Sequence, residues 1–397
     1  MAVGAGRVDR DGLGVSRDGR VGVGLIGAGM ISEQYLENLT RFPDVEVVRV
    51  GDIDTERAAA SAAKWGVARS GTGDEVLADD DVEIVVNLTL PATHVEVSSA
   101  ALKAGKHVWS EKPIGVDRES AKGLVDLAAS LGLKLGIAPD TVLGPGWQTA
   151  KRAIEAGAIG TPLTAVTSMQ WQGPDFIHPN ASFLYAKGAG PLFDIGPYYF
   201  TALVHLLGPV ASVVATGAKS RETRTLAVGP NAGAEFPVEV PTHVSVLTSF
   251  EQGGQGQSLL SFDTPLLRHG VFEVNGTEGT IVLPDPNMFG GGWPIRIARP
   301  LKDGATYPFE QEWETVLDEE PNVGRGLGIL DMARAIRTGG SHIATGEVGY
   351  HVLDTMVSVE ESIASRSFVD VASTVAPVPS LAEGFDPFAS TLEPVAV

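Results

Sequence analysis

The sequence predicts an α/β protein, with a doubly wound parallel sheet in the first half and an α+β region with an open, mainly antiparallel sheet in the second. The stretch Val21–Ser32 joins a run of small apolar residues to a glycine turn and the start of a helical pattern. Strand and helix patterns then alternate up to about residue 141, which is typical of a parallel sheet. After one further helical pattern, β-prone runs follow.

Length and composition fit two domains. The chain has 397 residues, 43% of them hydrophobic and 20% charged, which is enough to bury two cores. We expect residues 1–20 to be an extension that is neither a secretory signal nor a membrane anchor. Residues 21–141 would form the first domain and residues 142–397 the second. Elsewhere no apolar run reaches the ~18 residues that a membrane span needs, so we expect no membrane partner.

Charge and cysteine content exclude several classes of function. The formal net charge is −20, so nucleic acid is not an expected partner, and contacts to phosphate would come from backbone amides. The chain has no cysteine, which excludes disulfides, thiolate zinc sites and cysteine nucleophiles and fits the reducing cytoplasm. Its eight histidines are scattered without paired spacing, so the sequence predicts no metal site.

The glycine turn is suited to a dinucleotide. Gly27 permits the tight turn, Gly29 allows close approach of a pyrophosphate, and backbone N–H groups at Met30 and Ile31 open the next helix toward the negative charge. Ser32 stands where a third glycine is usual, and a small side chain still permits close packing. Glycine-rich turns also occur without a ligand, so the context must decide.

That context is Asp52, at the end of the β-rich run Val45–Asp54. A carboxylate at this point can accept hydrogen bonds from the adenosine ribose and repels a 2′-phosphate, which favours NAD over NADP. Alternatively, Asp52 only ends a strand or caps the helix that begins near Thr55, and Asp54 could equally be that cap.

Further elements place polar residues at the carboxyl edge of the predicted sheet, where ligands bind in open α/β sheets. Thr89–His94 follows one buried strand, and Glu111, Lys112 and Pro113 follow the next. The expected helices are Met30–Thr40, Thr55–Trp65, Val95–Lys103 and Asp117–Leu131, and the expected strands include Ile84–Leu88 and Lys134–Ala138.

In the second half we expect a helix at Trp147–Ala156 and then strands such as PLTAVTSMQW and VSVLTSFEQ. Glycine- and proline-rich stretches at Val228–Pro241 and Pro284–Pro294 read as loops, which could cover a site or decorate the surface. In GAGPLFDIGPYYFTALVHLLG, Asp194 and Tyr198 are four residues apart, so one helical turn would place them on the same side.

Five stretches occur in the order of a known family: GAGMIS, NLTLPATH, SEKP, GAGPLFDIGPYY and DMARAIRTGG…GEVGYHVLDTM. From Val21 to about Ser373 the chain resembles the glucose–fructose oxidoreductase, inositol dehydrogenase and rhizopine-catabolism (Gfo/Idh/MocA) oxidoreductases. The resemblance implies a Rossmann domain, NAD as cofactor, a catalytic Lys112 and a cis Lys112–Pro113 bond. For Lys112 alone, the alternative is an exposed lysine at a strand end. The expected cofactor-binding residues are Gly27, Gly29, Met30, Ile31, Asp52, Thr89, Pro91, His94, Glu111 and Lys112.

The family pattern after Asp194 has a histidine and then an acid, whereas this chain has Tyr198 and Thr201. A phenol can act as acid–base beside an ammonium group, here that of Lys112. The alternative for Tyr198 is an aromatic side chain packed on the sheet. We expect His178 to contact substrate or to be an exposed loop residue, and His205 to lie in the core.

These readings predict an NAD-dependent oxidoreductase acting on a ring carbinol of a sugar, glycoside or cyclitol, with Lys112, Asp194 and Tyr198 catalytic and with substrate contacts from these three and His178. Two alternatives are NAD-assisted oxidation and elimination of a glycoside, and a nucleotide-sensing regulator. Runs such as VSVLTSF are apolar at successive positions, so both faces of the second sheet would lose water. We therefore expect a homodimer or homotetramer, as the resemblance also implies.

Overall fold

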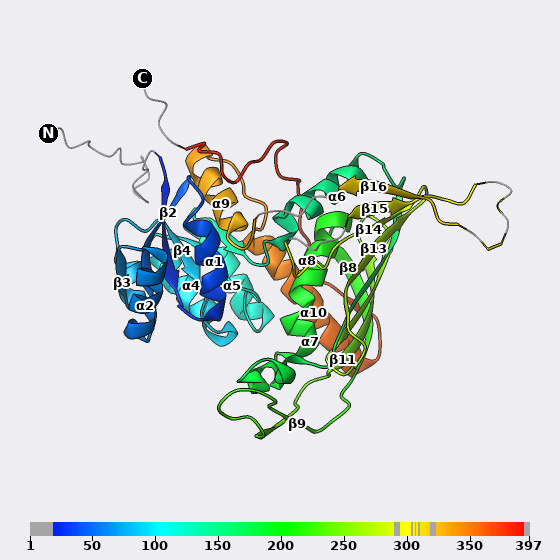
Figure 1. The fold of residues 1–397 in the computed structure, drawn as a ribbon, viewed down its shortest axis with the longest axis horizontal. Coiled ribbons are helices and arrows are strands. Elements are labelled where there is room, and N and C mark those ends of the chain that lie inside the picture. Colours follow the sequence, from blue (N-terminus) through cyan, green and yellow to red (C-terminus); the bar gives the residue numbers. More distant parts are fainter. Residues whose placement is uncertain are drawn as a thin grey trace. The chain divides into compact units, whose positions relative to one another are not determined.

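The structure is a computed structural model that describes residues 19–289, 294–302, 305, 307–308, 310–317 and 323–392 (Figure 1). The chain divides into two compact units. Of the described residues, the first unit comprises 19–140, 323–350 and 381–392, and the second comprises those between 141 and 317 together with 351–380. The predicted change of domain near 141 coincides with the first boundary. The prediction that everything after it belongs to one domain differs from this division.

The first unit contains a six-stranded sheet in the order β3-β2-β1-β4-β5-β6. Every neighbouring pair in it is parallel. Chain order reverses between β1 and β4, and in such sheets this switch point is where ligands bind, beyond the carboxyl ends of the strands. The strands are β1 Val21–Ile26, β2 Val45–Gly51, β3 Arg69–Gly71, β4 Ile84–Asn87, β5 His107–Ser110 and β6 Leu135–Ile137.

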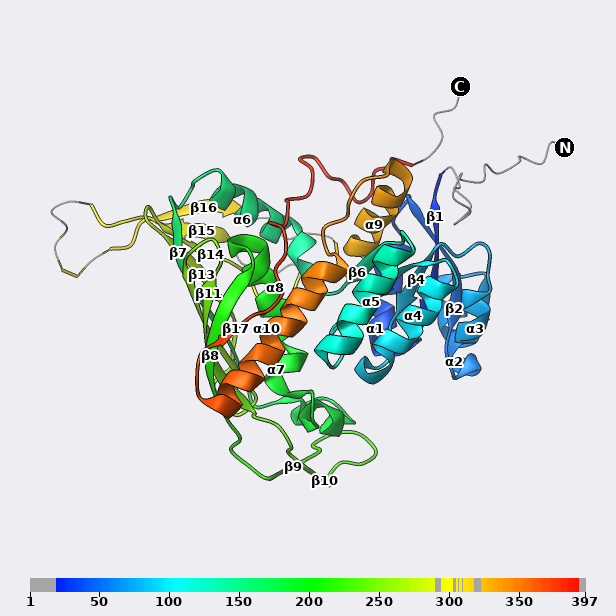
Figure 2. The same cartoon turned by 180° about the vertical axis from the view of Figure 1, so that it is seen from behind.

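Helices alternate with these strands, as predicted (Figures 1 and 2). They are α1 Met30–Leu39, α2 Thr55–Trp65, α3 Gly73–Leu77, η1 Pro91–Thr93, α4 His94–Lys103, α5 Arg118–Ser130 and, later in the chain, α9 Leu327–Thr338. Local signals set their ends: Asp54 caps α2 by accepting the N–H of Arg57, and Asp117 caps α5 by accepting that of Ser120. The expected helix boundaries hold to within about two residues.

The segment 323–350 completes the first unit at strand β6. The Ile137 N–H donates to the Ala344 carbonyl, and Asp140 accepts the N–H groups of Gly326 and Gly328 at 2.8 and 3.0 Å. An edge strand exposes unpaired backbone groups, and these contacts cover β6. Because these contacts join residues far apart in sequence, the alternation of strands and helices gave no sign of them.

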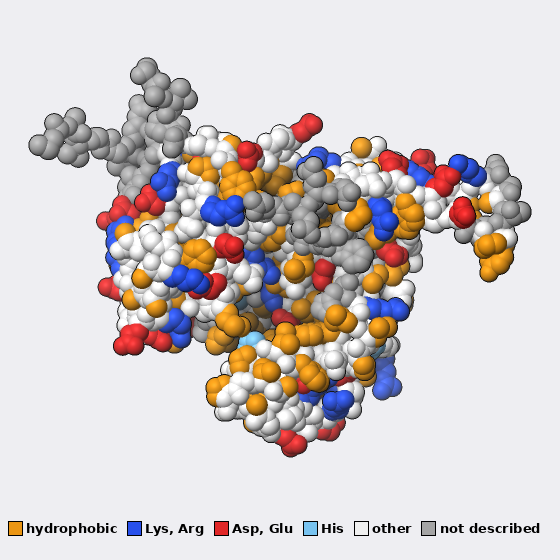
Figure 3. Space-filling view, viewed as in Figure 1, with side chains coloured by type: hydrophobic (Ala, Val, Ile, Leu, Met, Phe, Trp, Pro, Cys, Tyr) orange, Lys and Arg blue, Asp and Glu red, His pale blue; other side chains and the backbone are white. Residues whose placement is uncertain are grey.

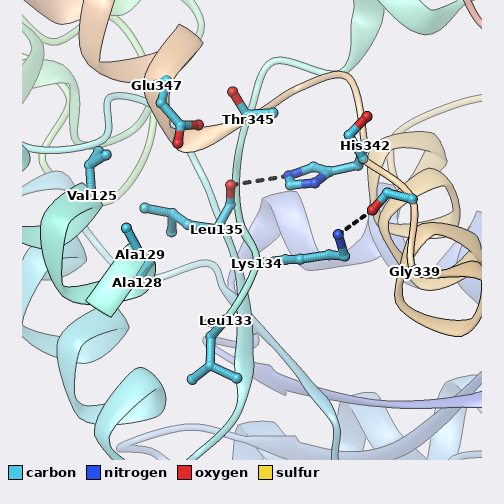
Figure 4. Close-up of a pocket in the computed structure, with 13 residues that line it drawn as sticks. Val125, Ala128, Ala129, Leu133, Lys134, Leu135, Gly339, His342, Thr345 and Glu347 are labelled. Carbon is cyan, nitrogen blue, oxygen red and sulfur yellow. Dashed lines mark hydrogen bonds between the residues drawn. The ribbon is translucent and has the colours of Figure 1, made fainter. Parts of the chain in front are cut away.

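Beside β6 the segment 339–347 also borders a pocket of about 420 Å³ (Figure 4). Lys134 donates its ammonium to the Gly340 carbonyl, and the His342 ring lies 3.1 Å from the Leu135 carbonyl. The C-terminal tail, residues 381–392, also attaches to the first unit. Asp44 accepts the N–H groups of Thr391 and Leu392, and the same carboxylate pairs with Arg334 of α9.

The second unit contains a nine-stranded sheet in the order β16-β15-β14-β13-β7-β12-β11-β8-β17. Its pairs are antiparallel except β7 with β12, which confirms the predicted open, mainly antiparallel sheet. The strands are β7 Pro162–Gln170, β8 Val210–Ala218, β11 His243–Phe250, β12 Gln255–Ser261, β13 Arg268–Gly276, β14 Thr280–Val282, β15 Ile295–Ala298, β16 Trp313–Leu317 and β17 Val369–Asp370.

Helices lie on one face of this sheet (Figures 1 and 2). Trp147 of α6 meets Phe272 edge to face, and Ser362 of α10 accepts the N–H of Ala215 on β8. The second unit holds η2 Thr141–Leu143, α6 Pro145–Glu155, η3 Pro174–Phe176, η4 Ala181–Tyr185, α7 Gly190–Asp194, α8 Gly196–Leu207 and most of α10 Gly346–Ser365.

One expected loop contains regular structure. Within Val228–Pro241, β10 (Glu235–Pro237) pairs with β9 (Thr223–Thr225) as a short hairpin. Of the other expected loop, residues 284–289 and Pro294 are irregular, and residues 290–293 lie outside the described residues. Among the helices that the structure describes, none is long and apolar enough to cross a membrane.

Candidate functional site

The glycine turn forms an open cradle at the carboxyl end of β1. Gly27 has a φ of +108°, and a Cβ there would stand 2.7 Å from the Leu88 carbonyl oxygen, so the turn requires glycine. At Gly29 a Cβ would meet nothing within 4 Å. Gly29 also precedes α1 without a side-chain cap. The space beside Gly29 and the first N–H groups of α1 therefore fit a pyrophosphate.

Asp52 lies at the end of β2 beside this cradle. Its carboxylate accepts the N–H groups of Ala28 (2.7 Å) and Asp54 (2.9 Å), and Arg57 lies 2.6 and 3.2 Å from its two oxygens. Burial opposes the charge, but these hydrogen bonds and the guanidinium outweigh it and lower the pKa of Asp52. Because Asp54 is the helix cap, Asp52 is left to face the cradle.

The turn after β4 is held by buried polar groups. Asn87 donates to the His94 carbonyl and to Ser98, each at 3.0 Å, and accepts the Thr89 hydroxyl at 2.7 Å. The fully buried His94 ring bridges two turns, with Nδ1 2.7 Å from the Pro113 carbonyl and Nε2 3.0 Å from the Thr89 carbonyl. Burial lowers the pKa of His94. The described contacts of its imidazole are therefore to the protein's own backbone, whereas Thr89 and Pro91 are partly exposed.

The turn after β5 carries Lys112. Its N–H donates to Oε2 of Glu111 at 3.0 Å, and Oε1 of Glu111 accepts the Tyr35 hydroxyl at 2.8 Å. The Lys112–Pro113 peptide bond is cis, as the family resemblance implied. Glu111 is buried, so the backbone of Lys112 is fixed from the interior of the first unit.

In the second unit, Asp194 and Tyr198 lie on two helices rather than one. α7 ends at Asp194, and α8 begins at Gly196 after the junction at Ile195. Pro197 has no N–H to continue the hydrogen-bond ladder of α7, so the chain starts a new helix. The argument from one continuous helical turn was therefore wrong. Tyr198 is buried and Asp194 is partly exposed.

The neighbouring Tyr199 anchors α8. It is fully buried, and its hydroxyl accepts the Gly270 N–H at 3.2 Å and lies 3.3 Å from Oδ1 of Asp285. Burial, together with the Asp285 charge, raises the pKa of Tyr199 well above the ordinary value. This phenol therefore stays protonated and serves the structure of the second unit.

His178 and His205 lie in different surroundings within the second unit. His178 is partly exposed beside η3; it accepts the Asn180 N–H and meets Phe183 edge to face. His205 is buried, with its Nε2 3.1 Å from Gln148, and burial lowers its pKa to about 3. The prediction that His205 is a core residue is confirmed.

Sequence reasoning missed three buried polar residues near the predicted site. Tyr35 and Asp140 are fully buried in the first unit, and Asn87 organises the turn that holds Thr89. Asn87 had a visible signal, because it interrupts an apolar strand. Tyr35 had none, since an aromatic residue on an amphipathic helix is normally read as core.

The predicted residues of the first unit gather at one edge of its sheet, while His178, Asp194 and Tyr198 belong to the second unit. The glycine turn, the uncapped start of α1 and Asp52 fit NAD. They would hold its pyrophosphate and adenosine ribose. Acidic and basic side chains are interspersed on the face in Figure 3.

Comparison with known proteins identifies both parts of the chain. Residues 21–138 match the model of the oxidoreductase family with an NAD-binding Rossmann fold, and residues 147–282 match the GFO/IDH/MocA C-terminal domain. An uncharacterized oxidoreductase of Rhizobium meliloti is 31% identical over 268 residues, which cover 66% of this chain and 74% of that protein.

Two named relatives match more of the chain. The 1,5-anhydro-D-fructose reductase of Ensifer adhaerens is 27% identical over 353 residues, covering 88% of this chain and 98% of the relative. The levoglucosan dehydrogenase of Pseudarthrobacter phenanthrenivorans is 29% identical over 394 aligned positions, covering 88% and 97%. A structure of levoglucosan dehydrogenase in complex with NADH and L-sorbose has the same fold (TM-score 0.77, 24% identity, covering 89% of this chain and 99% of that one). The chain therefore belongs to the GFO/IDH/MocA family of NAD-binding oxidoreductases.

Proposed function

We propose that this protein transfers a hydride between a ring carbinol of a sugar, glycoside or cyclitol and the nicotinamide of NAD. The observation that carries the proposal is the fixed Lys112 turn, at the same sheet edge as the glycine cradle and Asp52. The names of the relatives, a 1,5-anhydro-D-fructose reductase and a levoglucosan dehydrogenase, support carbohydrate as the substrate class.

In this proposal NAD supplies the hydride acceptor, and the chain supplies binding, orientation and proton transfer. The Lys112 ammonium stabilises negative charge that develops on the carbinol oxygen. Tyr198 or Lys112 takes the hydroxyl proton. Asp194 orients the substrate hydroxyl or the lysine, and His178 contacts the substrate.

A screen of NAD reduction across free sugars, glycosides and inositols tests the proposal, with product NMR to find the oxidised carbon. The expected result is stoichiometric NADH from at least one class. If NAD copurifies and a glycoside is cleaved without net NADH, the protein instead oxidises and eliminates its substrate with cofactor recycling. If no compound is turned over and NAD binding only changes affinity for a partner, the protein is a nucleotide-sensing regulator.

Changing Lys112 tests the assigned role. Lys112→Met is expected to lower turnover by more than ~100-fold, the scale of general acid–base loss, while NAD affinity survives. Lys122→Met is the matched control, because Lys122 is an exposed lysine of the same unit that pairs with Asp126. Near-normal turnover of Lys112→Met would remove this residue from the mechanism.

We also propose a homodimer, or a homotetramer made from two dimers, formed through the uncovered face of the nine-stranded sheet. On β11, Val244, Val246 and Phe250 are buried under the helices, whereas Leu247 points to the other face and is 53% exposed. Leu259 on β12 is half-buried and, by the register of the two strands, lies on the same face as Leu247. Soluble monomers seldom keep large apolar patches exposed. Light scattering that gave the monomer mass of 41.5 kDa at micromolar concentration would contradict this assembly.

A further inference from the structure

A buried chain of hydrogen bonds leads from α1 to the Lys112 turn. The Tyr35 hydroxyl donates to Oε1 of Glu111 at 2.8 Å, and Oε2 of Glu111 accepts the Lys112 N–H at 3.0 Å. Tyr35 is on α1, the helix that starts at the glycine cradle. One carboxylate therefore connects the cradle helix to the turn that carries Lys112.

The surroundings of Tyr35 and Glu111 keep the hydrogen bond between them intact. Tyr35 is fully buried, Glu111 is buried, and the indole N–H of Trp109 lies 3.3 Å from the Tyr35 oxygen. Burial, together with the charges of Glu111 and Asp140, raises the pKa of Tyr35 well above the ordinary value. The phenol therefore remains a hydrogen-bond donor at every working pH.

Other ionisable groups face this cluster from neighbouring elements. Asp140, after β6, adds negative charge, and Arg325, before α9, adds positive charge. Asp140 is tied to the backbone of Gly326 and Gly328 rather than to Glu111. Within the part of the chain that the structure describes, the Glu111 carboxylate accepts its hydrogen bonds from the Tyr35 hydroxyl and the Lys112 N–H.

We propose that Tyr35, acting through Glu111, is a positioning residue for Lys112. The inference rests on the proposed catalytic role of Lys112. A carboxylate held at both oxygens has a single orientation, so the N–H that it accepts is also held. Without the Tyr35 hydroxyl, the Glu111 carboxylate would be free to rotate. The Lys112 N–H would then lose an acceptor that is held in one position. Small errors in the position of a catalytic group are costly to turnover.

Three substitutions separate position from charge. Tyr35→Phe removes only the hydroxyl from a filled slot and is expected to lower kcat about tenfold, the scale of a lost bond to a charged group, with the KM for NAD within about twofold. Glu111→Gln keeps an acceptor for Lys112 and a polar group for Tyr35, so kcat is expected within about threefold of the original. Glu111→Asp keeps the charge but falls short of both partners, so kcat is expected to fall at least as far as in Tyr35→Phe.

NMR can follow the hydrogen bond from the Lys112 N–H to Glu111 without a measurement of turnover. In protein labelled with ¹⁵N-lysine, the Lys112 amide signal is assigned by its loss in Lys112→Met. The amide shift is expected to move in Tyr35→Phe and Glu111→Asp. Tyr185→Phe is the matched control, since Tyr185 is an equally buried phenol that donates to Asp175 in the second unit. The control is expected to lose stability and leave the Lys112 signal in place.

Two results would overturn the inference: an unchanged Lys112 amide signal in Tyr35→Phe, or a slow Glu111→Gln beside a near-normal Glu111→Asp, which would assign the effect to charge. Thermal unfolding of each variant checks that it folds, and the Glu111 pair decides the matter if Tyr35→Phe does not fold. If the unmodified protein reduces no NAD with any substrate, the proposed function fails, while the amide shift still decides whether Tyr35 holds the Lys112 turn.

Discussion

The Arg57 side chain changes the electrostatics of the predicted ribose site. It lies against both oxygens of Asp52, so the carboxylate that should repel a 2′-phosphate is partly compensated. We predict at least a tenfold preference for NAD over NADP in kcat/KM. Arg57→Ala is expected to widen that preference about tenfold, because the uncompensated carboxylate repels the phosphate more strongly. Equal efficiency with both cofactors in the unmodified enzyme would show that the guanidinium turns toward the phosphate instead.

The raised pKa of Asp140 predicts how this residue changes the free energy of unfolding with pH. Burial raises the pKa of Asp140 to about 6, whereas an unfolded aspartate titrates near ~3.9. Between these values the unfolded chain has released a proton that the folded chain keeps, so this carboxyl lowers the free energy of unfolding as pH rises. The stability of Asp140→Asn relative to the original is therefore expected to increase from pH 4 to 6, by at most about 1.4 kcal/mol per pH unit. Urea unfolding at pH 4.5 and 7.5 measures it; a pH-independent difference would contradict it.

Single residues could be predicted from the sequence where their role depends on neighbouring positions in the chain. Gly27 announces a left-handed turn, and Asp52 follows directly from the end of a β-rich run. The sequence did not predict Tyr35, because the partner of its hydroxyl is Glu111, 76 positions away. A polar contact between distant positions leaves no mark on local periodicity.

The C-terminal tail acts as one element with the first unit. Asp44 is fully buried and accepts the Thr391 hydroxyl at 2.6 Å as well as two tail N–H groups. Thr391→Val is expected to lower the free energy of unfolding by about 1.5 to 3 kcal/mol, the range for a bond to a charged group. Thr40→Val is the control, because Thr40 is likewise an exposed threonine, and its hydroxyl donates to the Leu36 backbone carbonyl of its own helix rather than to a charged group. Equal effects of the two substitutions in urea would contradict a tail clamp.

Helices and strands were predicted best where one continuous stretch of sequence carries both the periodic pattern and the residues that end it. Thr55–Trp65 matches α2 at both ends, because Asp54 and Gly66 mark them. The order of the second sheet could not be predicted, since β7 pairs with β12 in parallel and with β13 in the opposite direction over long separations. The break between α7 and α8 could have been read from Pro197, but the expected helical turn from Asp194 to Tyr198 overrode it.

For the whole molecule, buried histidines predict sensitivity to acid. Burial lowers the pKa of His107 and His342 to about 4 and that of His205 to about 3, while unfolded histidines titrate near ~6.5. Below pH 6.5 the unfolded chain therefore binds more protons, and the free energy of unfolding falls as pH falls. Asp140 and Asp331, with pKa values raised to about 6, oppose this between pH 6 and 4.

The net expectation is a steep loss of stability just below pH 6.5 and a shallower one from pH 6 to 4. Urea unfolding at half-unit steps of pH measures both slopes. His342→Gln is expected to reduce the initial slope by up to about 1.4 kcal/mol per pH unit. Constant stability between pH 7 and 5 would show that these imidazoles take up protons in the folded chain.

The three separate stretches of the first unit have a consequence for synthesis on the ribosome. When residue 140 emerges, Asp140 still lacks the amides of Gly326 and Gly328, β6 lacks its cover, and Asp44 lacks Thr391. Residues 141–322, which supply the second sheet except β17, are made before any of these partners. The unit that begins first is thus completed last. A fragment released at residue 140 should carry an open strand edge and two buried carboxylates without their donors, and should aggregate where the full chain folds.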